Sequence, residues 1–532
     1  MSVRITVFIV VATLTVAGAA QGQGFNPLEA FGKAMENAAK QQGQPTQAAA
    51  QPANAQARPA AATQLGIAVA SKREVVYEGY SKEMQPVKQL LAEGSAAQAL
   101  QSRTPEGGGL DSLDMLGNLE LATLAMDAQA LAAAKDGFQR AELALNQKDD
   151  RSTVGGFFSG AKDTMLSTLT GNDELGEYPG AGYERVLMLN YKSIAHLLDG
   201  ERSAYNVTRR AIDLQNIEKQ RFDELVRAAE AKIKEEEDKQ KENGADLGAY
   251  GFDDVVDQQY RATDKIARKV PHAFVNPFGF YIAGVVQELD SYEDRSLRDN
   301  ARISYSKALE LNPKSAVIKQ AVAELRKPAR KGRRLVNVII AEGFAPEKKL
   351  LKFNLILGAS LPTPIELPLY ESVDSAVARV DIRLPSGKRL ARASEVADIS
   401  ALALRFQKDA GPIYQLRMMT TVIRNIIEGQ AWNQAQQQAG LFGSVFGGLK
   451  KARDEMAHPD MRSWVTLPSR LLAARVFVPA SVTKVQVVAY DRKGRKLSSQ
   501  MVSIDRETPS LVYARVIDKT MYAAASKAMW VK

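Results

Sequence analysis

The stretch ARISYSKALELNP, residues 301–313, predicts more about the fold than any other part of the chain. Ala301, Tyr305 and Ala308 recur at helical spacing, and Pro313 follows closely enough to end the helix. Small residues let two helices approach closely, and an aromatic side chain fills the groove between successive helix pairs. The stretch therefore predicts the second helix of a hairpin within an array of stacked helix pairs.

Two earlier segments share this spacing, and the second has threonine at the aromatic position. The repeated positions are Ala134, Phe138 and Ala141, then Ala204 and Ala211, then Ala301, Tyr305 and Ala308. Residues 113–125, 183–198 and 278–289 are each predicted to form the preceding helix. This is the spacing of a tetratricopeptide repeat, so we predict a tetratricopeptide-like helical domain over residues 65–326. A generic α-helical array is the alternative.

A basic segment, KPARKGRR at residues 327–334, marks a change from helical to β-branched sequence and is predicted to be a solvated linker. Residues 335–532 are predicted to form a β-rich, sandwich-like domain with a helical insertion at 394–438. The fold class predicted is thus multidomain α+β. The predicted strands cover residues 336–340, 350–357, 377–384, 471–478, 484–490 and 511–516. The sequence DRKG, residues 491–494, predicts a hairpin turn.

The N-terminus is typical of an exported protein. Arg4 precedes an apolar run from Ile5 to Val16, and small residues follow, so residues 1–20 are predicted to be a cleaved signal peptide. Residues 21–64, rich in Gln, Ala and Pro, are predicted to be a disordered tether. These features predict a periplasmic location. The chain has no cysteine, so lipidation on cysteine is excluded.

Composition argues against an enzyme. The chain has three histidines without metal-binding spacing, and it lacks Gly-x-Ser-x-Gly and phosphate-cradling glycine motifs. We therefore predict no catalytic residue, no cofactor and no metal. A net charge of +9 is mild for a chain of this length; a basic surface is compatible with an anionic partner such as a lipid headgroup, a cell-wall polymer or nucleic acid. Nucleic acid is not predicted, because no dense Lys/Arg cluster with interleaved aromatics is evident.

Residues 342–346 and 460–468 are the two most distinctive segments of the β-rich half. In the second we predict structural roles for Asp460, Arg462, Trp464 and Pro468. Trp464 is expected inside the sandwich, Arg462 is expected to pair with Asp460 or a backbone carbonyl, and Pro468 is expected to end the strand. A binding pocket at this corner is the alternative.

Two glycine-rich segments each carry two phenylalanines and a nearby lysine: Phe157 with Phe158, and Phe442 with Phe446. Glycine contributes no burial, so such aromatics are candidates for contact with a partner protein or with a membrane surface. The alternative is that the phenylalanines pack back against the body of the protein.

Residues 183–216, 276–312, 343–346 and 460–468 together resemble an uncharacterised family of proteobacterial exported proteins. The resemblance covers about residues 70–500. It implies tetratricopeptide-like helices followed by a C-terminal β domain. Genes of that family commonly lie near those of lipoproteins that activate penicillin-binding proteins. Most members resemble lipoproteins, whereas this chain lacks the lipidated cysteine.

These features predict a non-catalytic periplasmic scaffold or adaptor that binds a protein or peptide partner in cell-wall or outer-membrane assembly. A structural subunit of a larger envelope machine is the second interpretation. A hydrolase of cell-wall polymer is the third, and it would need convergent acid and base groups that the sequence does not reveal.

Overall fold

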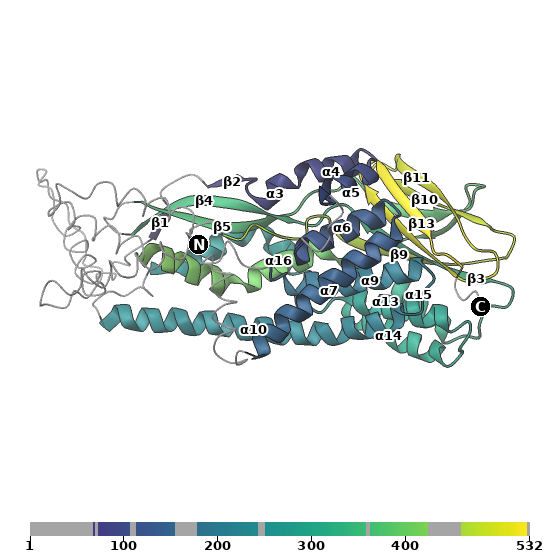
Figure 1. Ribbon diagram of the computed structural model, residues 1–532, viewed down its shortest axis with the longest axis horizontal. Coiled ribbons are helices and arrows are strands. Elements are labelled where there is room, and N and C mark those ends of the chain that lie inside the picture. Colours follow the sequence, from purple (N-terminus) through teal and green to yellow (C-terminus); the bar gives the residue numbers. More distant parts are fainter. Residues whose placement is uncertain are drawn as a thin grey trace, which may run out of the picture.

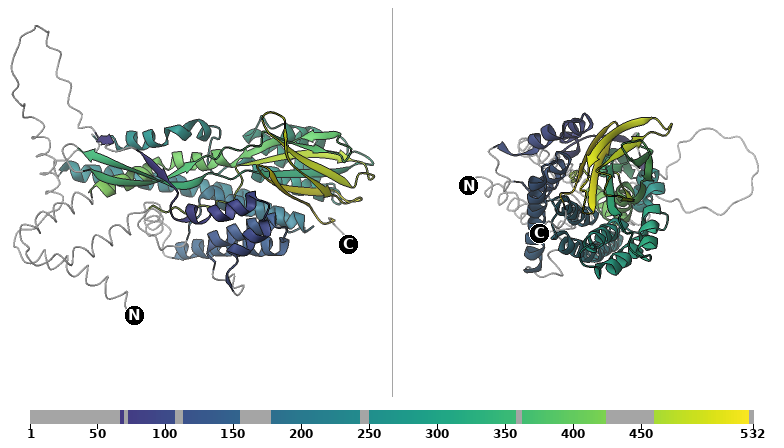
Figure 2. Two further views of the ribbon diagram at one scale, coloured as in Figure 1. Left: turned by 90° about the horizontal axis from the view of Figure 1, so that it is seen from above. Right: turned by 90° about the vertical axis from the view of Figure 1, so that its right-hand side faces the viewer.

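The computed structural model describes residues 67–69, 73–106, 113–154, 178–242, 250–357, 362–423 and 459–528. They form a mixed α/β body in which helices pack against three β-sheets (Figure 1). Figure 2 shows the same body from two other sides, with strands running along its length. The prediction that the chain combines helices with β-sheet is confirmed.

The helices of the first half pack as consecutive pairs, α6 with α7, α9 with α10, and α13 with α14. The helices are α3 (Tyr80–Glu83), α4 (Gln85–Ala92), α5 (Ala96–Arg103), α6 (Met115–Asp127), α7 (Leu131–Val154), α9 (Gly182–Leu198), α10 (Ala204–Glu242), α11 (Phe252–Tyr260), the 3-10 turn η4 (Arg261–Thr263), α12 (Asp264–Ala267), α13 (Pro277–Asp290), α14 (Leu297–Leu311), α15 (Ala316–Leu325) and α16 (Ile399–Asp409). The helices predicted before each repeat correspond to α6, α9 and α13.

Glycines on α7 and α13 set how closely these helices approach their partners. A Cβ atom on Gly137 would lie 2.9 Å from Cβ of Ala122 on α6, and one on Gly284 would lie 2.7 Å from the ring of Tyr305 on α14. Neither position has room for a larger side chain. The repeat positions on α7, α10 and α14 are all fully buried: Ala134, Phe138, Ala141, Ala204, Ala211, Ala301, Tyr305 and Ala308.

Three sheets are present in the described residues. The strands are β1 (Ile67–Val69), β2 (Glu74–Val76), β3 (Arg334–Glu342), β4 (Glu347–Leu357), β5 (Thr363–Glu371), β6 (Arg379–Arg383), β7 (Arg389–Arg392), β8 (Ser394–Asp398), β9 (Arg470–Val478), β10 (Lys484–Tyr490), β11 (Lys496–Ser503), β12 (Ser510–Ile517) and β13 (Thr520–Ala525). Sheet A pairs β4 with β5 on one side and with β1 and β2 on the other. Sheet B has the order β13-β12-β3-β9-β8, and sheet C has the order β11-β10-β6-β7. The pairing of β12 with β3 is parallel.

Sheets B and C enclose an aliphatic core between them. Val336, Val338 and Ile340 of β3 pack in this core with Val485 and Val487 of β10. The alternate residues of β3 belong to a second core on the other face of sheet B, toward the helices. Since all nine residues of β3 are buried, this strand lies between two cores.

The second core joins the helices to the sheets. Phe138 on α7, Tyr191 on α9, Trp464 before β9 and Tyr513 on β12 belong to one apolar cluster. The ring centroid of Tyr191 lies 5.9 Å from that of Trp464 and 6.5 Å from that of Tyr513. The segment 327–334 is exposed up to residue 333, but the core is continuous across it.

The helical insertion predicted at 394–438 begins later than expected. Residues 394–398 form β8, which pairs with β9 at the edge of sheet B, and the helix starts at Ile399. The carboxylate of Asp398 accepts a hydrogen bond from the backbone N–H of Ala401 at 2.9 Å and so caps α16. Residues 411–423 are also helical, and the rest of the predicted insertion lies outside the described residues.

The predicted signal peptide, the tether, and the loops with Phe157, Phe158, Phe442 and Phe446 also lie outside the described residues. Among the helices that are described, none has the length and apolar character needed to cross a bilayer.

Candidate anion-binding face

The segment 460–468 contains the predicted Asp460–Arg462 pair and the proline that was expected to end a strand. Nε and Nη2 of Arg462 each lie 3.0 Å from the carboxylate of Asp460, which confirms the predicted pair. Burial opposes ionisation of Asp460, but Lys348 and Arg462 hold its pKa below the usual value. Pro468 was expected to end a strand and instead precedes β9. A proline lacks the N–H that strand pairing needs, so it fits just before the strand.

Trp464 is fully buried, as predicted, but the predicted place was wrong. It lies in the core between the helices and sheet B, whereas the core between sheets B and C is aliphatic. The indole Nε1 donates to Oγ1 of Thr123 on α6 at 3.0 Å and to Oγ1 of Thr466 at 3.1 Å. An indole N–H needs such partners when it is buried, and α6 supplies one.

Two buried carboxylates fix the backbone around Trp464. Glu120 on α6 accepts from the backbone N–H of Val465 at 2.8 Å and of Thr466 at 3.2 Å. Glu184 on α9 accepts from the N–H of Trp464 at 2.9 Å. Burial raises the pKa of Glu120 to about 7, although these hydrogen bonds favour its charged form. Both carboxylates are engaged by backbone donors, which assigns them a structural role.

Sequence reasoning missed both glutamates. Glu120 stands among apolar residues on α6, and a charged residue in that setting signals a buried partner. Glu184 lies in the first turn of α9 beside Arg185, where an acidic residue is common and gives no such signal.

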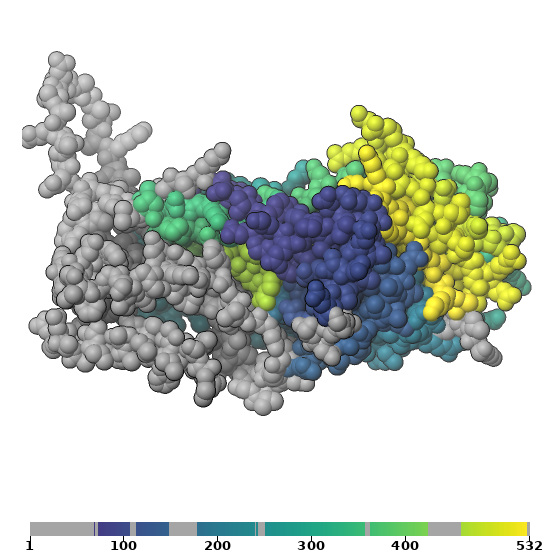
Figure 3. All heavy atoms as spheres, turned by 45° about the horizontal axis from the view of Figure 1, so that its top comes forward, coloured from purple at the N-terminus to yellow at the C-terminus, as the bar shows by residue number. Residues whose placement is uncertain are grey.

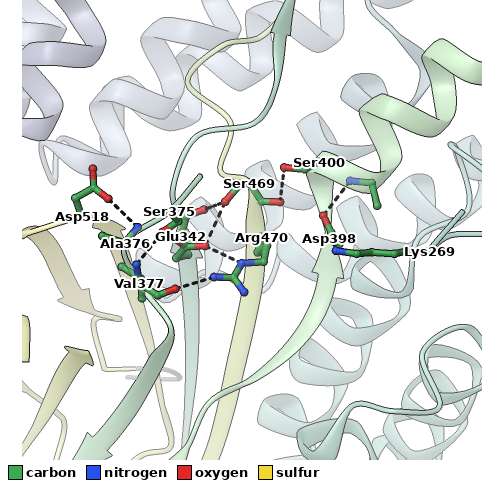
Figure 4. A network of polar contacts seen from close by, with 11 residues as sticks. Lys269, Glu342, Ser375, Ala376, Val377, Asp398, Ser400, Ser469, Arg470 and Asp518 are labelled. Carbon is green, nitrogen blue, oxygen red and sulfur yellow. Dashed lines mark hydrogen bonds and ion pairs between the residues drawn. The ribbon is translucent and has the colours of Figure 1, made fainter. Parts of the chain in front are cut away.

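A further polar network holds the chain just before β6 (Figure 4). Glu342, at the end of β3, accepts from Arg470 Nε at 2.8 Å, from Ser469 Oγ at 3.2 Å and from Ser375 Oγ. Arg470 also donates from Nη2 to the carbonyl of Val377 at 3.1 Å. Both serines donate to a carboxylate, and no histidine activates either of them among the described hydrogen bonds. The network therefore positions the chain and does not form a nucleophilic site.

The same network continues on both sides. Asp518 accepts from the backbone N–H of Ala376 at 3.2 Å, and Lys269 donates to Asp398 at 2.8 Å. The N–H of Ala378 donates to the carbonyl of Tyr490 at 2.8 Å. Residues 375–378 are thus fixed at several points, and β6 begins directly after them.

β6 and β7 present an arginine cluster on the outer face of sheet C. Asp381 of β6 is fully buried, and nitrogens of four guanidinium groups surround its carboxylate: Arg383 at 3.2 Å, Arg392 at 3.5 Å, Arg379 at 3.7 Å and Arg389 at 3.9 Å. The side chains of Arg389 and Arg392 are 50% and 54% exposed. One carboxylate therefore faces four cations at the surface.

The two hairpins of sheet C, residues 379–392 and 484–503, contain ten Lys or Arg residues and two Asp residues. Their net charge is thus +8, while that of the whole chain is +9. The core-facing side chains of β6 and β10 are apolar, so the charge of these strands lies on the outer face and on the turns. We call this surface the basic face. In Figure 3 the yellow C-terminal strands, to which β10 and β11 belong, lie at the surface beside the purple helices α3–α5.

An aromatic ring lies beneath part of the cluster. The guanidinium carbons of Arg379 and Arg383 lie 4.4 Å and 5.6 Å from the ring centroid of Tyr490 on β10. Such cation–π contacts hold the guanidinium groups near the ring. The cluster is therefore supported by Tyr490 as well as by Asp381.

Clustered, partly exposed guanidinium groups bind anions, because their N–H donors match the oxygens of carboxylates and phosphates. Sequence reasoning missed this site because the charge looked mild when it was averaged over the chain. The signal was available in RVDIR, where charged residues alternate along a strand, and in the two further arginines of the RLAR sequence that follows. The described residues include no cluster of His, Asp and Glu that could hold a metal ion.

Comparison with known proteins adds no assignment: no family model, curated protein or solved structure matches the chain.

Proposed function

We propose that this protein is a non-catalytic scaffold of the bacterial cell envelope that binds an anionic partner through its basic face. The observation that carries the proposal is the concentration of nearly all the net charge on two hairpins of one sheet. A surface of one sign attracts ligands of the opposite sign and speeds their association.

Two features support the scaffold part of the proposal. The repeat positions are buried at close helix contacts, as a tetratricopeptide-like array requires, and such arrays commonly present a binding surface to a protein or peptide. The polar network around Glu342 fixes the strand that carries Arg379, Asp381 and Arg383, so the basic face is rigidly supported. Export to the periplasm rests on the N-terminal sequence alone.

Retention on immobilised heparin, a general polyanion, tests the proposal. The double variant Arg389→Gln, Arg392→Gln removes two charges from the basic face. The matched control, Lys314→Gln with Lys319→Gln, removes two exposed charges at and near α15. We expect the first variant to elute at clearly lower salt than the control, although both have the same net charge. Elution of both variants at the same salt concentration would contradict the proposal.

A further inference from the structure

We propose that the four arginines around Asp381 form a binding site for a phosphate monoester group. This inference rests on the proposed function, since it names the anion that the basic face binds. It follows from three properties of the cluster: convergence, unused hydrogen-bond donors, and surplus charge.

The arginines converge because of the strand register. Arg392 lies directly opposite Asp381, and Arg389 lies opposite Arg383 after a register shift between β6 and β7. The four guanidinium groups come within 3.2–3.9 Å of one carboxylate. A single anion above that carboxylate would therefore be within reach of several of them.

Most N–H donors of the four arginines have no described hydrogen-bond partner. Arg383 Nη2 donates a hydrogen bond to the carboxylate of Asp381 at 3.2 Å, and Arg383 Nη1 donates to the carbonyl of Gly387 at 2.9 Å. The Nε atoms of Arg379 and Arg383 also have no hydrogen-bond partner among the described residues, but they are buried and do not face a ligand in solvent. Each guanidinium has five N–H donors, and those that a ligand can reach belong mainly to the half-exposed side chains of Arg389 and Arg392.

The surplus positive charge of the cluster favours one class of anion over others. Four arginines and one aspartate leave three positive charges without a partner in the cluster. A carboxylate or a phosphodiester supplies one negative charge and two terminal oxygens. A phosphate monoester supplies about −1.5 to −2 charges at neutral pH and three terminal oxygens. The monoester therefore matches both the charge and the donors better than the other two.

The cluster is poorly suited to nucleic acid. Binding of single strands relies on aromatic rings on which bases stack. The ring of Tyr490 is already covered by Arg379 and Arg383. The chemistry of the cluster points to the phosphate group itself.

Calorimetric titration of the full chain tests the inference, with glycerol 3-phosphate, dimethyl phosphate and acetate as probes. We expect glycerol 3-phosphate to bind about tenfold more tightly than the other two, or better. Its affinity should rise as the pH passes its second pKa of about 6, where it becomes a dianion. The Arg389→Gln, Arg392→Gln variant should lose this preference.

A lysine variant separates geometry from charge. Arg389→Lys with Arg392→Lys keeps both charges but removes bidentate donation, so it should keep heparin retention and lose the preference for the monoester. Binding to vesicles of phosphatidylcholine that contain either phosphatidic acid or phosphatidylglycerol shows whether the bound phosphate group belongs to a lipid or to a soluble molecule. Preference for phosphatidic acid assigns the site to a lipid headgroup, and binding of soluble glycerol 3-phosphate alone assigns it to a free ligand.

The outcomes that overturn the two proposals differ. Equal binding of the three soluble probes, with heparin retention still dependent on Arg389 and Arg392, would refute the phosphate inference and leave the proposed function standing. Heparin retention that does not depend on these arginines would refute both. Thermal melting of each variant shows whether it is folded.

Discussion

Asp381 and Arg392 lie directly opposite each other on β6 and β7, and Nε of Arg392 is 3.5 Å from Oδ1 of Asp381. The pair lies on the outer face of sheet C, where three more arginines share the same carboxylate. Asp381 therefore acts as the centre of a cationic cluster. Its single charge reduces the repulsion among four guanidinium groups without cancelling their attraction for an anion.

Asp381→Asn should destabilise the protein, because the four arginines would repel one another without a compensating charge. We expect a loss of about 1–3 kcal/mol, below the cost of breaking a fully buried pair since the arginines are partly exposed. Sulfate or phosphate should restore more stability to this variant than to the parent. Thermal melts in chloride and in sulfate measure both effects. A variant with parent-like stability in chloride would show that Asp381 does not organise the cluster.

Gly284→Ala should disrupt the contact between α13 and α14. The added methyl would lie 2.7 Å from the ring of Tyr305, whose hydroxyl donates to Glu288 at 2.9 Å. Overpacking of this kind costs about 1–3 kcal/mol. Gly411→Ala is the control, since a methyl there meets nothing within 4 Å. Urea unfolding compares the two, and equal stability would contradict the close helix packing.

Trp464→Ala should destabilise the junction between helices and sheets by about 3–5 kcal/mol, the usual cost of removing a buried large aromatic side chain. The side chain is fully buried against Phe138 and Tyr191. Because the core is continuous, we expect helices and strands to unfold together in a single transition. Circular dichroism of helix content, recorded beside tyrosine fluorescence in the same variant, checks this. Two separate transitions would argue for independent domains.

Asp127→Asn should weaken the dependence of stability on pH. Burial raises the pKa of Asp127 to about 7, although Arg515 at 3.7 Å favours the charged form. Between about pH 4 and about pH 7 the folded protein therefore keeps a proton that the unfolded chain has released. The stability contributed by this group is present at low pH and is lost as the pH rises to about 7.

The test compares the free energy of unfolding at about pH 5 and about pH 8 by urea titration of parent and variant. The parent should lose more stability than Asp127→Asn over this interval. Glu120 has a raised pKa as well and remains in both proteins, so part of the dependence should persist. An identical change in both proteins would mean that Asp127 does not titrate in this range.

The elements with a strong local pattern could be predicted from the sequence. The strand predicted at 484–490 is β10, residue for residue, and the turn predicted at 491–494 is the β10–β11 hairpin, with Gly494 at a φ of 78°. Alternating β-branched residues and a glycine that favours positive φ are local signals. In contrast, β5 was missed because Pro364 and Pro368 argue against a strand, yet β5 pairs with β4 along its whole length.

The candidate site depends on pairings between distant segments and could not be predicted in the same way. Val488 of β10 pairs with Asp381 across more than a hundred residues of chain, so the basic face forms only after folding. The burial of Trp464 was predictable from its size and neighbours. Its position against α6 was not, because Thr123 and Glu120 are brought to it by the helix packing.

Arginine footprinting tests the central claim, that the basic face binds an anionic partner, most directly. Phenylglyoxal modifies accessible arginines, and peptide mass spectrometry follows the rate at each one with and without heparin. We predict that heparin slows modification of Arg389 and Arg392. Arg268, which directly follows helix α12 and has a side chain that is 71% exposed, should keep its rate. Unchanged rates at Arg389 and Arg392, with heparin bound and other arginines protected, would contradict the claim.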